Sequence, residues 1–383
     1  MCYHERQMQK NTVNPFLLAG YNGPELFCDR EAETSALVSA LSNGRNVTLI
    51  SPRRMGKTGL IHHAFNRIAR TDKDCRCFYI DIFATQNLAE FVALFGKTVL
   101  GKLDGFSESA VRKLAGFFTS FMPRFSINPQ TGAPEVTFDI RAGEAERSLT
   151  EIFDYIAKSG RQCRIAIDEF QQILDYPDKG IEALLRSHTQ FAPNVTFIFA
   201  GSEQHLMDTM FSSAKRPFYQ SAQKISLREI PIEPYREFAA AKFAAGGRNL
   251  PATVFDRVYG MLSGHTWYVQ LVLNILYSRN KKNCADADVD DAVEGILKEE
   301  SATYKTYCGM LPAGQLRVLR AVAMEKTVTS PTGSAFISRH GLGATSSVKL
   351  ALKALCEKAL ILKNDNGEYS VYDRFFGLWL MRG

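Results

Sequence analysis

The sequence is poor in two features that would place it in a membrane or outside the cell: long apolar runs and paired cysteines. No apolar run among the 383 residues approaches the roughly 20 that a membrane-spanning helix needs, and the start, MCYHERQMQKN, has no signal-peptide core. Of the eight cysteines only Cys75 and Cys77 lie close together, and no second pair completes a zinc site. We therefore expect a soluble cytoplasmic protein with reduced thiols and no membrane partner.

Length and charge indicate a protein of several parts. A chain of 383 residues, 45% of them hydrophobic, is too long for one ordinary core, so two or three domains are expected. The net charge of +6 is unevenly distributed, because the segment from Thr306 to the end holds ten Lys and Arg residues against five Asp and Glu residues. Most of the excess positive charge therefore lies in the last fifth of the chain.

The most informative stretch is SPRRMGKT, residues Ser51–Thr58. It lies between an apolar run, Val47–Ile50, and a helix-like segment, Gly59–Ala69, which is the strand, loop and helix order of a phosphate-binding loop. Backbone N–H groups of the loop and the positive end of the helix would point at the phosphates of a nucleotide. Lys57 would reach the β and γ phosphates, and Thr58 would offer its hydroxyl to Mg²⁺.

One position departs from the usual loop pattern. Ser51 stands where the first glycine is expected, at the turn out of the strand, and serine can often adopt the conformation that glycine makes easy. We expect the whole loop to contact the nucleotide. Its residues are Ser51, Pro52, Arg53, Arg54, Met55, Gly56, Lys57, Thr58 and Gly59.

The segment before the loop has two interpretations. A helix is predicted over Glu31–Leu41, from apolar residues at helical spacing. Phe27 and Arg30, just before it, are candidates for contact with the nucleotide base, as such lead-in segments commonly pack there. Alternatively, the segment is a strap that seals the core.

A second chemical signature is CRIAIDEFQQIL, residues 163–174. Its apolar half predicts a buried strand with Asp168 and Glu169 at the carboxyl end, and two carboxylates there are costly unless their charge is used. Asp168 would hold Mg²⁺ through water or through the hydroxyl of Thr58, and Glu169 would orient and polarise the attacking water. The pair follows the phosphate loop by about 110 residues, which strengthens both motifs.

Two further candidates for catalysis follow. A strand over Val195–Ala200 leads to Ser202, which would contact the γ-phosphate or the lytic water, or else belongs to a plain Gly-Ser turn. Lys215 and Arg216 precede another strand, Gln223–Leu227. Arg216 would act as an arginine finger on the nucleotide of a neighbouring subunit, or else lies in a solvated basic loop.

The remaining elements of the first half are read from periodicity. A strand over Cys77–Phe83 and helices over Asn87–Leu103 and Ser107–Phe121 are predicted. The stretch Arg124–Ile140 then reads as a two-stranded hairpin, an insertion of unassigned role within residues 123–140. His62 and His63 point about 100° apart on their helix, which disfavours a shared metal.

Together, SPRRMGKT, IAIDEF, the Gly-Ser pair after the next strand, and KRPFY resemble the archaeal-type ATPase family, a group of AAA+/STAND-like P-loop NTPases. The resemblance implies ATP and Mg²⁺ as cofactors and a five-stranded parallel sheet with helices on both faces. A helical lid and a winged-helix domain would follow. We therefore expect an ATPase core over residues 1–231, a lid over 232–305 and a winged helix over 306–383.

The lid departs from the family pattern at one turn. Relatives carry Gly-x-Pro at the start of the third lid helix, where the backbone approaches the nucleotide, whereas this chain has Gly264, His265, Thr266 and Trp267. Without the proline the turn is less pre-set, which leaves open how this lid senses nucleotide. His265 is either a phosphate contact or a buried structural histidine.

The last domain resembles a winged helix. Helices are predicted over Ala313–Met324, Ser334–His340 and from Thr345 or Ser346 to Lys358, the presumed recognition helix. Strands over Ala359–Lys363 and Glu368–Tyr372 would form the wing around an NDNG turn. The final FFGLWL needs burial, under the winged helix or against a partner.

The presumed recognition helix has a buried stripe and an exposed face. The stripe is predicted from four apolar residues: Val348, Leu352, Leu355 and Ala359. Ser346, Lys349 and Lys353 share the opposite face, which together with the basic surplus favours double-stranded DNA as a partner. Glu357 near that face disfavours it, and a protein partner or self-association is the alternative.

Two functions are compatible with these motifs. The leading hypothesis is a slow Mg²⁺-dependent ATPase that uses ATP as a switch or motor coupled to the winged helix, with Lys57 and Glu169 catalytic. The alternative is a nucleotide-gated interaction protein with negligible hydrolysis.

Overall fold

The chain folds into two compact units. The computed structural model describes residues 14–104, 119–127, 134–364 and 366–382. Among the described residues, one unit lies within 19–230, and the other combines residues 14–18 with residues from 231 to 382. The predicted helix Ser107–Phe121 lies outside the described residues except at its end, where Phe121 begins a strand instead. Among the helices described, none is both long and apolar enough to cross a membrane.

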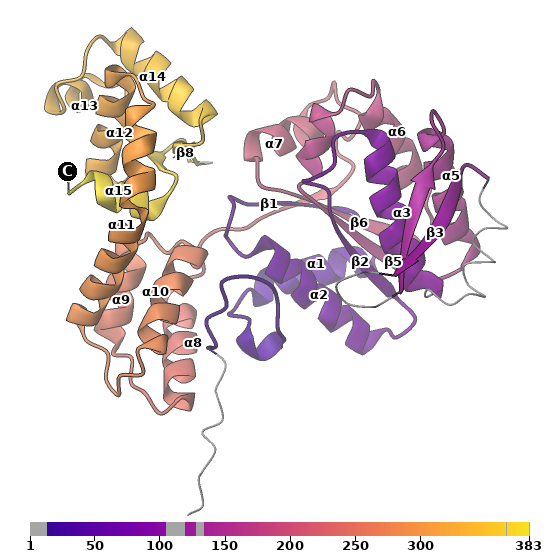
Figure 1. Cartoon of the computed structure of the whole chain (residues 1–383), viewed down its shortest axis with the longest axis horizontal. Helices are drawn as coiled ribbons and strands as arrows, with labels where there is room; N and C mark the ends of the chain where they lie inside the picture. The colour runs from indigo at the N-terminus through magenta and orange to yellow at the C-terminus, as the bar shows by residue number, and fades with distance from the viewer. Residues whose placement is uncertain (1–13, 105–118, 128–133, 365, 383) are drawn as a thin grey trace, which may run out of the picture. The chain divides into compact units, whose positions relative to one another are not determined.

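A five-stranded parallel sheet forms the centre of the unit 19–230 (Figure 1). The strand order is β2-β5-β6-β1-β7, so the strand before the phosphate loop lies inside the sheet. Residues of β5, β6 and β1 are buried throughout, as expected for parallel strands covered on both faces. The strand bounds are Val47–Ile50 (β1), Arg76–Asp81 (β2), Cys163–Asp168 (β5), Val195–Gly201 (β6) and Gln223–Ser226 (β7).

Helices cover both faces of the sheet (Figure 1). On one face, Glu31–Ser42 (α1) and Lys57–Thr71 (α2) pack over an aliphatic core that includes Leu49 and Leu60. The opposite face is richer in phenylalanine, including Phe199. Its helices are Leu88–Asp104 (α3), Ala145–Lys158 (α5), Ile181–Gln190 (α6) and Gln204–Ser212 (α7). The expected α/β architecture is confirmed.

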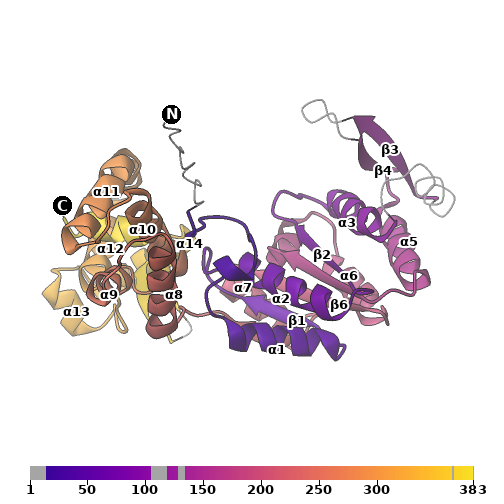
Figure 2. The same cartoon turned by 90° about the horizontal axis from the view of Figure 1, so that it is seen from below.

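The inserted hairpin is also confirmed. Strands β3 (Phe121–Ile127) and β4 (Pro134–Ile140) pair antiparallel, with Phe121 opposite Ile140 and Ile127 opposite Pro134. The turn expected between them lies outside the described residues. Figure 2 shows the hairpin projecting beyond α3, so it adds an arm to the sheet domain without joining the sheet.

The second unit is mainly helical. Its bounds are α8 Ile232–Ala245, α9 Ala252–Met261, α10 Thr266–Ser278, α11 Asp286–Gly309, α12 Ala313–Glu325, α13 Ser334–Arg339, α14 Thr345–Glu357, β8 Ile361–Lys363, β9 Tyr369–Val371 and α15 Arg374–Leu380. The helices and strands predicted within the winged helix agree with α12, α13, α14, β8 and β9 to within two residues, whereas α11 was not predicted and runs across the expected boundary between residues 305 and 306.

The start of the described chain packs with this second unit, whereas the sequence placed it with the ATPase core. Asn14 Nδ2 donates to the carbonyl of Asn274 at 2.9 Å, and Asn274 Nδ2 donates to the carbonyl of Phe16 at 2.7 Å. Phe16 is fully buried beside Phe243 and Tyr277. This aromatic anchor explains why residues 14–18 leave the core.

The helices and strands predicted for the winged helix are confirmed, and its predicted buried stripe is confirmed except at one position. Val348, Leu352 and Leu355 of α14 are buried, but Ala359 is exposed. The prediction for Ala359 was wrong because α14 ends at Glu357 and the chain turns there, with φ of 52° at Ala359. The apolar tail forms α15, whose Phe376 ring lies 4.9 Å from Tyr304 of α11. The tail is therefore buried within its own unit.

Candidate functional site

The phosphate loop has the backbone that its sequence predicts. Strand β1 ends at Ile50 and α2 begins at Lys57, with Gly56 as the preceding cap at φ of 93°. Arg54 also has positive φ, 66°, a conformation that a non-glycine residue adopts at a cost of order 1 kcal/mol or more. Consecutive turns of this kind direct backbone N–H groups into one concavity, which binds anions. The loop is therefore shaped for phosphate.

Ser51 fills the place of the missing glycine. It is fully buried, its N–H donates to the carbonyl of Gly201 at 3.3 Å, and its hydroxyl donates to the carbonyl of Pro52 at 3.1 Å. The serine hydroxyl is thus engaged with the adjacent carbonyl of the loop. Arg53 and Arg54 are exposed, whereas Met55 is buried.

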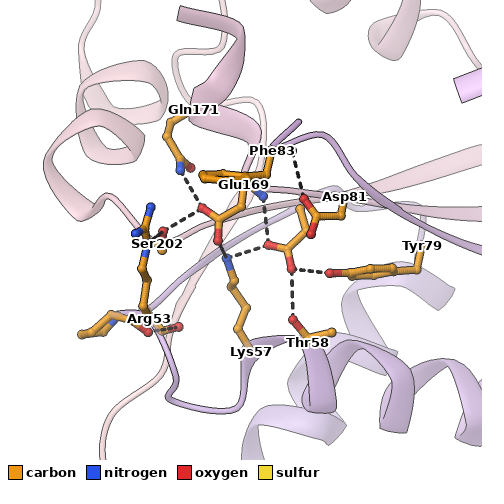
Figure 3. A network of polar contacts seen from close by, with 12 residues as sticks. Arg53, Lys57, Thr58, Tyr79, Asp81, Phe83, Glu169, Gln171 and Ser202 are labelled. Carbon is orange, nitrogen blue, oxygen red and sulfur yellow. Dashed lines mark hydrogen bonds and ion pairs between the residues drawn. The ribbon is translucent and has the colours of Figure 1, made fainter. Parts of the chain in front are cut away.

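Lys57 and Thr58 both contact Asp168 at the end of β5, and Figure 3 shows these two side chains within the polar network of the site. The Nζ atom of Lys57 lies 2.6 Å from Oδ1 of Asp168, and the Thr58 hydroxyl donates to Oδ2 at 3.1 Å. Lys57 and Asp168 are both buried, with 7% and 3% of their surface exposed. The two motifs, 110 residues apart in sequence, therefore form one site as predicted.

Glu169 is held by three side chains (Figure 3). Its Oε1 lies 3.3 Å from Nζ of Lys57, and its Oε2 accepts hydrogen bonds from Ser202 at 2.7 Å and from Gln171 at 2.6 Å. The backbone at Glu169 is left-handed, φ 54°, and its N–H donates to Oδ1 of Asp168. The structure thus brings the predicted Ser202 to the predicted water-activating carboxylate.

Two residues of this network carry no signal in the sequence. The Tyr79 hydroxyl, from β2, donates to Oδ2 of Asp168 at 2.6 Å. Gln171 follows Glu169 by two residues, and its side chain packs against Gly201. A Cβ atom on Gly201 would lie 2.5 Å from Oε1 of Gln171, so only glycine leaves room for this side chain. Tyr79 reaches Asp168 because β2 pairs with β5, with Asp81 opposite Asp168, a neighbour relation that local sequence does not encode.

Lys57 decides how the two carboxyls ionise. Burial by itself raises the pKa of Asp168, but the charge of Lys57 and hydrogen bonds from Lys57 and Tyr79 outweigh it and bring the pKa below its ordinary value. Burial also raises the pKa of Glu169. The charge of Lys57 and the hydrogen bonds from Ser202 and Gln171 outweigh this effect, so the pKa of Glu169 lies below its ordinary value. Both groups are therefore carboxylates at neutral pH.

The oxygen donors at this site suit Mg²⁺. Among the described residues, no group of three or more His, Cys, Asp or Glu side chains could hold a metal unaided. Mg²⁺ does not need one, because it is usually bound through one or two carboxylates together with substrate phosphates and water. The adjoining oxygens of Thr58 and Asp168 fit that pattern.

The lead-in segment touches the loop and the start of α2. Arg30 is buried, and its Nη2 donates to the carbonyl of Met55 at 3.3 Å. The Phe27 ring stacks on the His63 ring with centroids 4.4 Å apart. A Cβ atom on Gly59 would lie 3.3 Å from the Phe27 ring, so Phe27 lies close to the start of α2. Arg30 therefore contacts the phosphate loop, and both interpretations of the segment, contact with the base and a strap that seals the core, stay predictions. His62 and His63 are half-buried.

Two predicted residues lie elsewhere. Arg216 forms an ion pair with Glu182 of α6, Nη2 to Oε1 2.9 Å, and burial raises the pKa of Glu182 although Arg216 opposes this. His265 belongs to the other unit, where it is 7% exposed and its ring centroid lies 4.7 Å from that of Tyr268. Their roles toward nucleotide stay predictions.

Comparison with known proteins agrees with this geometry. Residues 27–272 match the family described as an ATPase domain predominantly from Archaea, and residues 302–382 match a probable winged helix domain. An uncharacterized ATP-binding protein of Methanocaldococcus jannaschii is 24% identical over 298 residues, which cover 73% of this chain and 76% of that protein. A second one from the same organism is 29% identical over 210 residues, covering 51% and 54%.

Two solved structures share the fold over nearly the whole chain. A Walker-type ATPase of Pyrococcus abyssi has a TM-score of 0.63 at 19% identity, covering 96% of this chain and 99% of that one. The structure of the ORC2 protein of Aeropyrum pernix in its ADPNP-ADP complexes has a TM-score of 0.58 at 15% identity, and the match covers 96% of each chain. The chain therefore belongs to the family of ATPase domains found predominantly in Archaea, as an ATP-binding P-loop protein with a C-terminal winged helix domain.

Proposed function

We propose that this protein is a slow Mg²⁺-dependent ATPase that uses ATP as a conformational switch. One observation carries the proposal: Lys57 of the phosphate loop lies within 2.6 Å of Asp168 and 3.3 Å of Glu169, while Thr58 donates to Asp168. A cation for phosphate, two oxygens for a metal and a further carboxylate for water thus converge at one point. These are the parts that phosphoryl transfer to water requires.

Each side chain has a distinct role in the proposed reaction. The loop N–H groups and Lys57 bind the phosphates and stabilise charge on the transferring group. Thr58 and Asp168 would hold Mg²⁺, which would supply charge neutralisation for the transferring phosphoryl group. Glu169 orients a water in line with the γ-phosphorus and accepts its proton as the bond to the leaving oxygen breaks.

Binding of phosphate would rearrange the carboxylates. Lys57 cannot remain 2.6 Å from Asp168 and 3.3 Å from Glu169 while its Nζ moves to the β and γ phosphates. Glu169 then keeps Ser202 and Gln171 as partners, both on Oε2, and Oε1 becomes available for water. We assign Ser202 the role of positioning Glu169 and sensing the γ-phosphate through it.

Arg216 is proposed to act in trans. Its side chain is one-third exposed and is tied to Glu182 by a single ion pair, so it can exchange that partner for a phosphate of a neighbouring subunit. Self-association would then be required for turnover. Phe27 and Arg30 are proposed to contact the nucleotide base, and His265 is proposed to contact phosphate.

The winged helix is the proposed output of the switch. Ser346, Lys349 and Lys353 of α14 are exposed, in line with contact to double-stranded DNA. The pairing of Lys353 with Glu357 at 3.8 Å weakens this face, since it offsets one of its two positive charges. DNA binding is therefore tested separately from turnover.

A nucleotide-gated interaction protein with negligible hydrolysis is the second candidate. The observation that favours it is the set of contacts that Glu169 makes: its Oε2 accepts from Ser202 and Gln171, and its Oε1 lies 3.3 Å from Lys57. Oε1 must lose its contact with Lys57 before it can accept a proton from water.

The deciding experiment measures ATP binding and phosphate release together. The wild type is compared with Lys57→Ala and Glu169→Gln, and with Lys305→Ala as a control on an exposed lysine of α11. We expect Lys57→Ala to lose binding, Glu169→Gln to bind ATP without turnover, and the control to match the wild type. Equal release from all four proteins would assign the activity to a contaminant, and binding without release by the wild type would establish the second candidate.

A further inference from the structure

A polar cleft lies at the edge of the sheet opposite the phosphate loop. The loop follows the carboxyl end of β1 at Ile50, whereas the cleft includes Asn46, just before that strand begins. Its volume is 540 Å³, and its walls come from the amino ends of β5 and β6 and the last turns of α1 and α6. Among the described residues that line it are two arginines, Arg164 and Arg186, and no carboxylate.

Arg164 is a buried cation without a counter-charge in the described structure. It lies on β5, opposite Thr196 of β6 in register, and is 8% exposed. Both of its hydrogen bonds leave from Nη1 and reach neutral acceptors, Oε1 of Gln162 at 3.3 Å and the carbonyl of Cys163 at 3.2 Å. Its Nε has no hydrogen-bond partner. A guanidinium cannot lose its proton, so burial without an anion is unfavourable.

Other groups around Arg164 strengthen the positive field. Arg186 of α6 is half-buried on the wall of the same cleft. The Thr196 hydroxyl, on the strand beside Arg164, is buried and has no hydrogen-bond partner. Burial raises the pKa of the nearby Cys163 thiol to about 11, and three arginines, Arg164 among them, oppose that rise. Cationic and hydroxyl groups from separate elements thus converge without an acid among them.

We propose that this cleft binds a phosphate group of a small polar molecule. Two guanidinium groups offer parallel N–H donors, the geometry that holds phosphate oxygens in pairs. Phosphate is favoured over a carboxylate because its three terminal oxygens can accept from both arginines and from the unpartnered hydroxyl of Thr196, whereas a carboxylate has only two oxygens. The site is separate from the nucleotide site, because parallel strands place the phosphate loop and the cleft at opposite ends of β1.

The test uses inorganic phosphate as the probe. All proteins carry Lys57→Ala, so that phosphate binding by the loop is removed and the result does not depend on ATP hydrolysis. Melting temperature and calorimetric binding are measured against phosphate, with sodium chloride at matched ionic strength as the reference. We expect saturable binding that raises the melting temperature, because a ligand of the folded state stabilises it.

Three variants assign the binding to the cleft. Arg164→Met and Arg186→Gln are each expected to weaken phosphate binding about tenfold, as loss of a charge-assisted hydrogen bond does. Arg161→Gln is the matched control, an exposed arginine three residues before Arg164 that does not line the cleft. Should Arg164→Met fail to fold, Arg186→Gln at the half-buried position still decides. The proposal would be overturned if phosphate raised the melting temperature no more than sodium chloride does. It would also be overturned if Arg186→Gln and Arg161→Gln bound phosphate with equal affinity.

Discussion

The Tyr79 hydroxyl donates to Oδ2 of Asp168 at 2.6 Å, the same oxygen that accepts from Thr58 at 3.1 Å. The other oxygen, Oδ1, faces Lys57 and the N–H of Glu169. Phosphate would compete for Lys57 but not for Tyr79. Burial and the adjacent carboxylate raise the pKa of Tyr79, so its hydroxyl stays protonated and keeps donating. Tyr79 therefore fixes the orientation of Asp168 both with and without a bound nucleotide.

Replacing Tyr79 with phenylalanine removes only that hydrogen bond. We expect Tyr79→Phe to raise several-fold the Mg²⁺ concentration that half-saturates turnover, while ATP affinity in EDTA stays unchanged. The free energy of unfolding should fall by about 1 kcal/mol, as for one buried hydrogen bond. Magnesium titrations and urea denaturation measure both effects. Tyr219→Phe, at a tyrosine 40% exposed, serves as control, and an unchanged magnesium titration would rule out the positioning role.

Removing the Ser202 hydroxyl should affect turnover and not binding. Ser202 donates to Oε2 of Glu169 at 2.7 Å, so Ser202→Ala leaves the carboxylate less well oriented toward water. We expect a fall of about tenfold in kcat with ATP affinity unchanged. Phosphate release at saturating ATP is compared with Ser212→Ala, an exposed serine at the end of α7. A loss confined to ATP affinity would instead place Ser202 against the nucleotide.

Stability should depend on pH through the two carboxyls at the site. The pKa values of Asp168 and Glu169 are lowered in the folded protein, since Lys57 outweighs the effect of burial. Their contribution to stability is complete above the unfolded pKa values, about 3.9 and 4.3, and is lost as the pH falls through the lower folded values. Urea denaturation midpoints between pH 7 and pH 3 measure this loss.

The same titration in Lys57→Ala provides the contrast. Without the lysine, the hydrogen bonds from Tyr79, Ser202 and Gln171 remain, but the largest effect that opposes burial is lost, so the pKa of each carboxyl should rise above its wild-type value. We therefore expect the loss of stability below pH 4 to be smaller in Lys57→Ala than in the wild type. An equal or larger loss would show that other carboxyls dominate acid unfolding.

Mixing two inactive variants tests the proposed trans role of Arg216. Arg216→Ala retains its own loop but lacks the finger, and Lys57→Ala lacks the loop lysine but retains Arg216. If Arg216 reaches a neighbouring nucleotide, each variant alone should lose at least about 100-fold in turnover, and the mixture should regain part of it. Phosphate release across a range of mixing ratios measures the recovery. A mixture no more active than its components argues for the ion pair with Glu182 as the sole role.

The exposed face of α14 should govern any binding to DNA. Lys349→Gln and Lys353→Gln are each expected to weaken binding to duplex DNA and to reduce the slope of log affinity against log salt by about one. The fluorescence anisotropy of a labelled duplex measures both quantities, with Lys305→Gln as control. If the affinity of the wild type for duplex DNA did not depend on salt concentration, a contact of this face with the DNA phosphates would be excluded.

Residues that belong to short motifs could be predicted from the local sequence. Residues whose role depends on which strand lies beside them in the sheet could not. Lys57, Thr58, Asp168 and Glu169 follow from two motifs, and their contacts show that these residues lie together, while their roles stay predictions. Tyr79 could not be found, because its role depends on β2 lying beside β5, which is set by packing over the whole sheet.

Two errors have equally specific causes. The helix stripe was extended to Ala359 although α14 ends at Glu357, since no proline or glycine marks that end. Residues 14–18 were assigned to the nearest domain in sequence, whereas burial of Phe16 beside Phe243 places them with the other unit. Contacts across more than 200 residues of chain leave no periodic signal near either partner.

The placement of residues 14–18 has a consequence for dissecting the molecule. Because both flanks of residues 19–230 belong to the same unit, the ATPase core is inserted in that unit's sequence and is joined to it by two chain segments, near Leu18 and near Ile230. A single proteolytic cut at either junction leaves one covalent connection, and release of the core needs both. A fragment beginning at Ala19 and ending at Ile230 respects these junctions, whereas one beginning at Met1 would leave Phe16 without the aromatic rings that bury it.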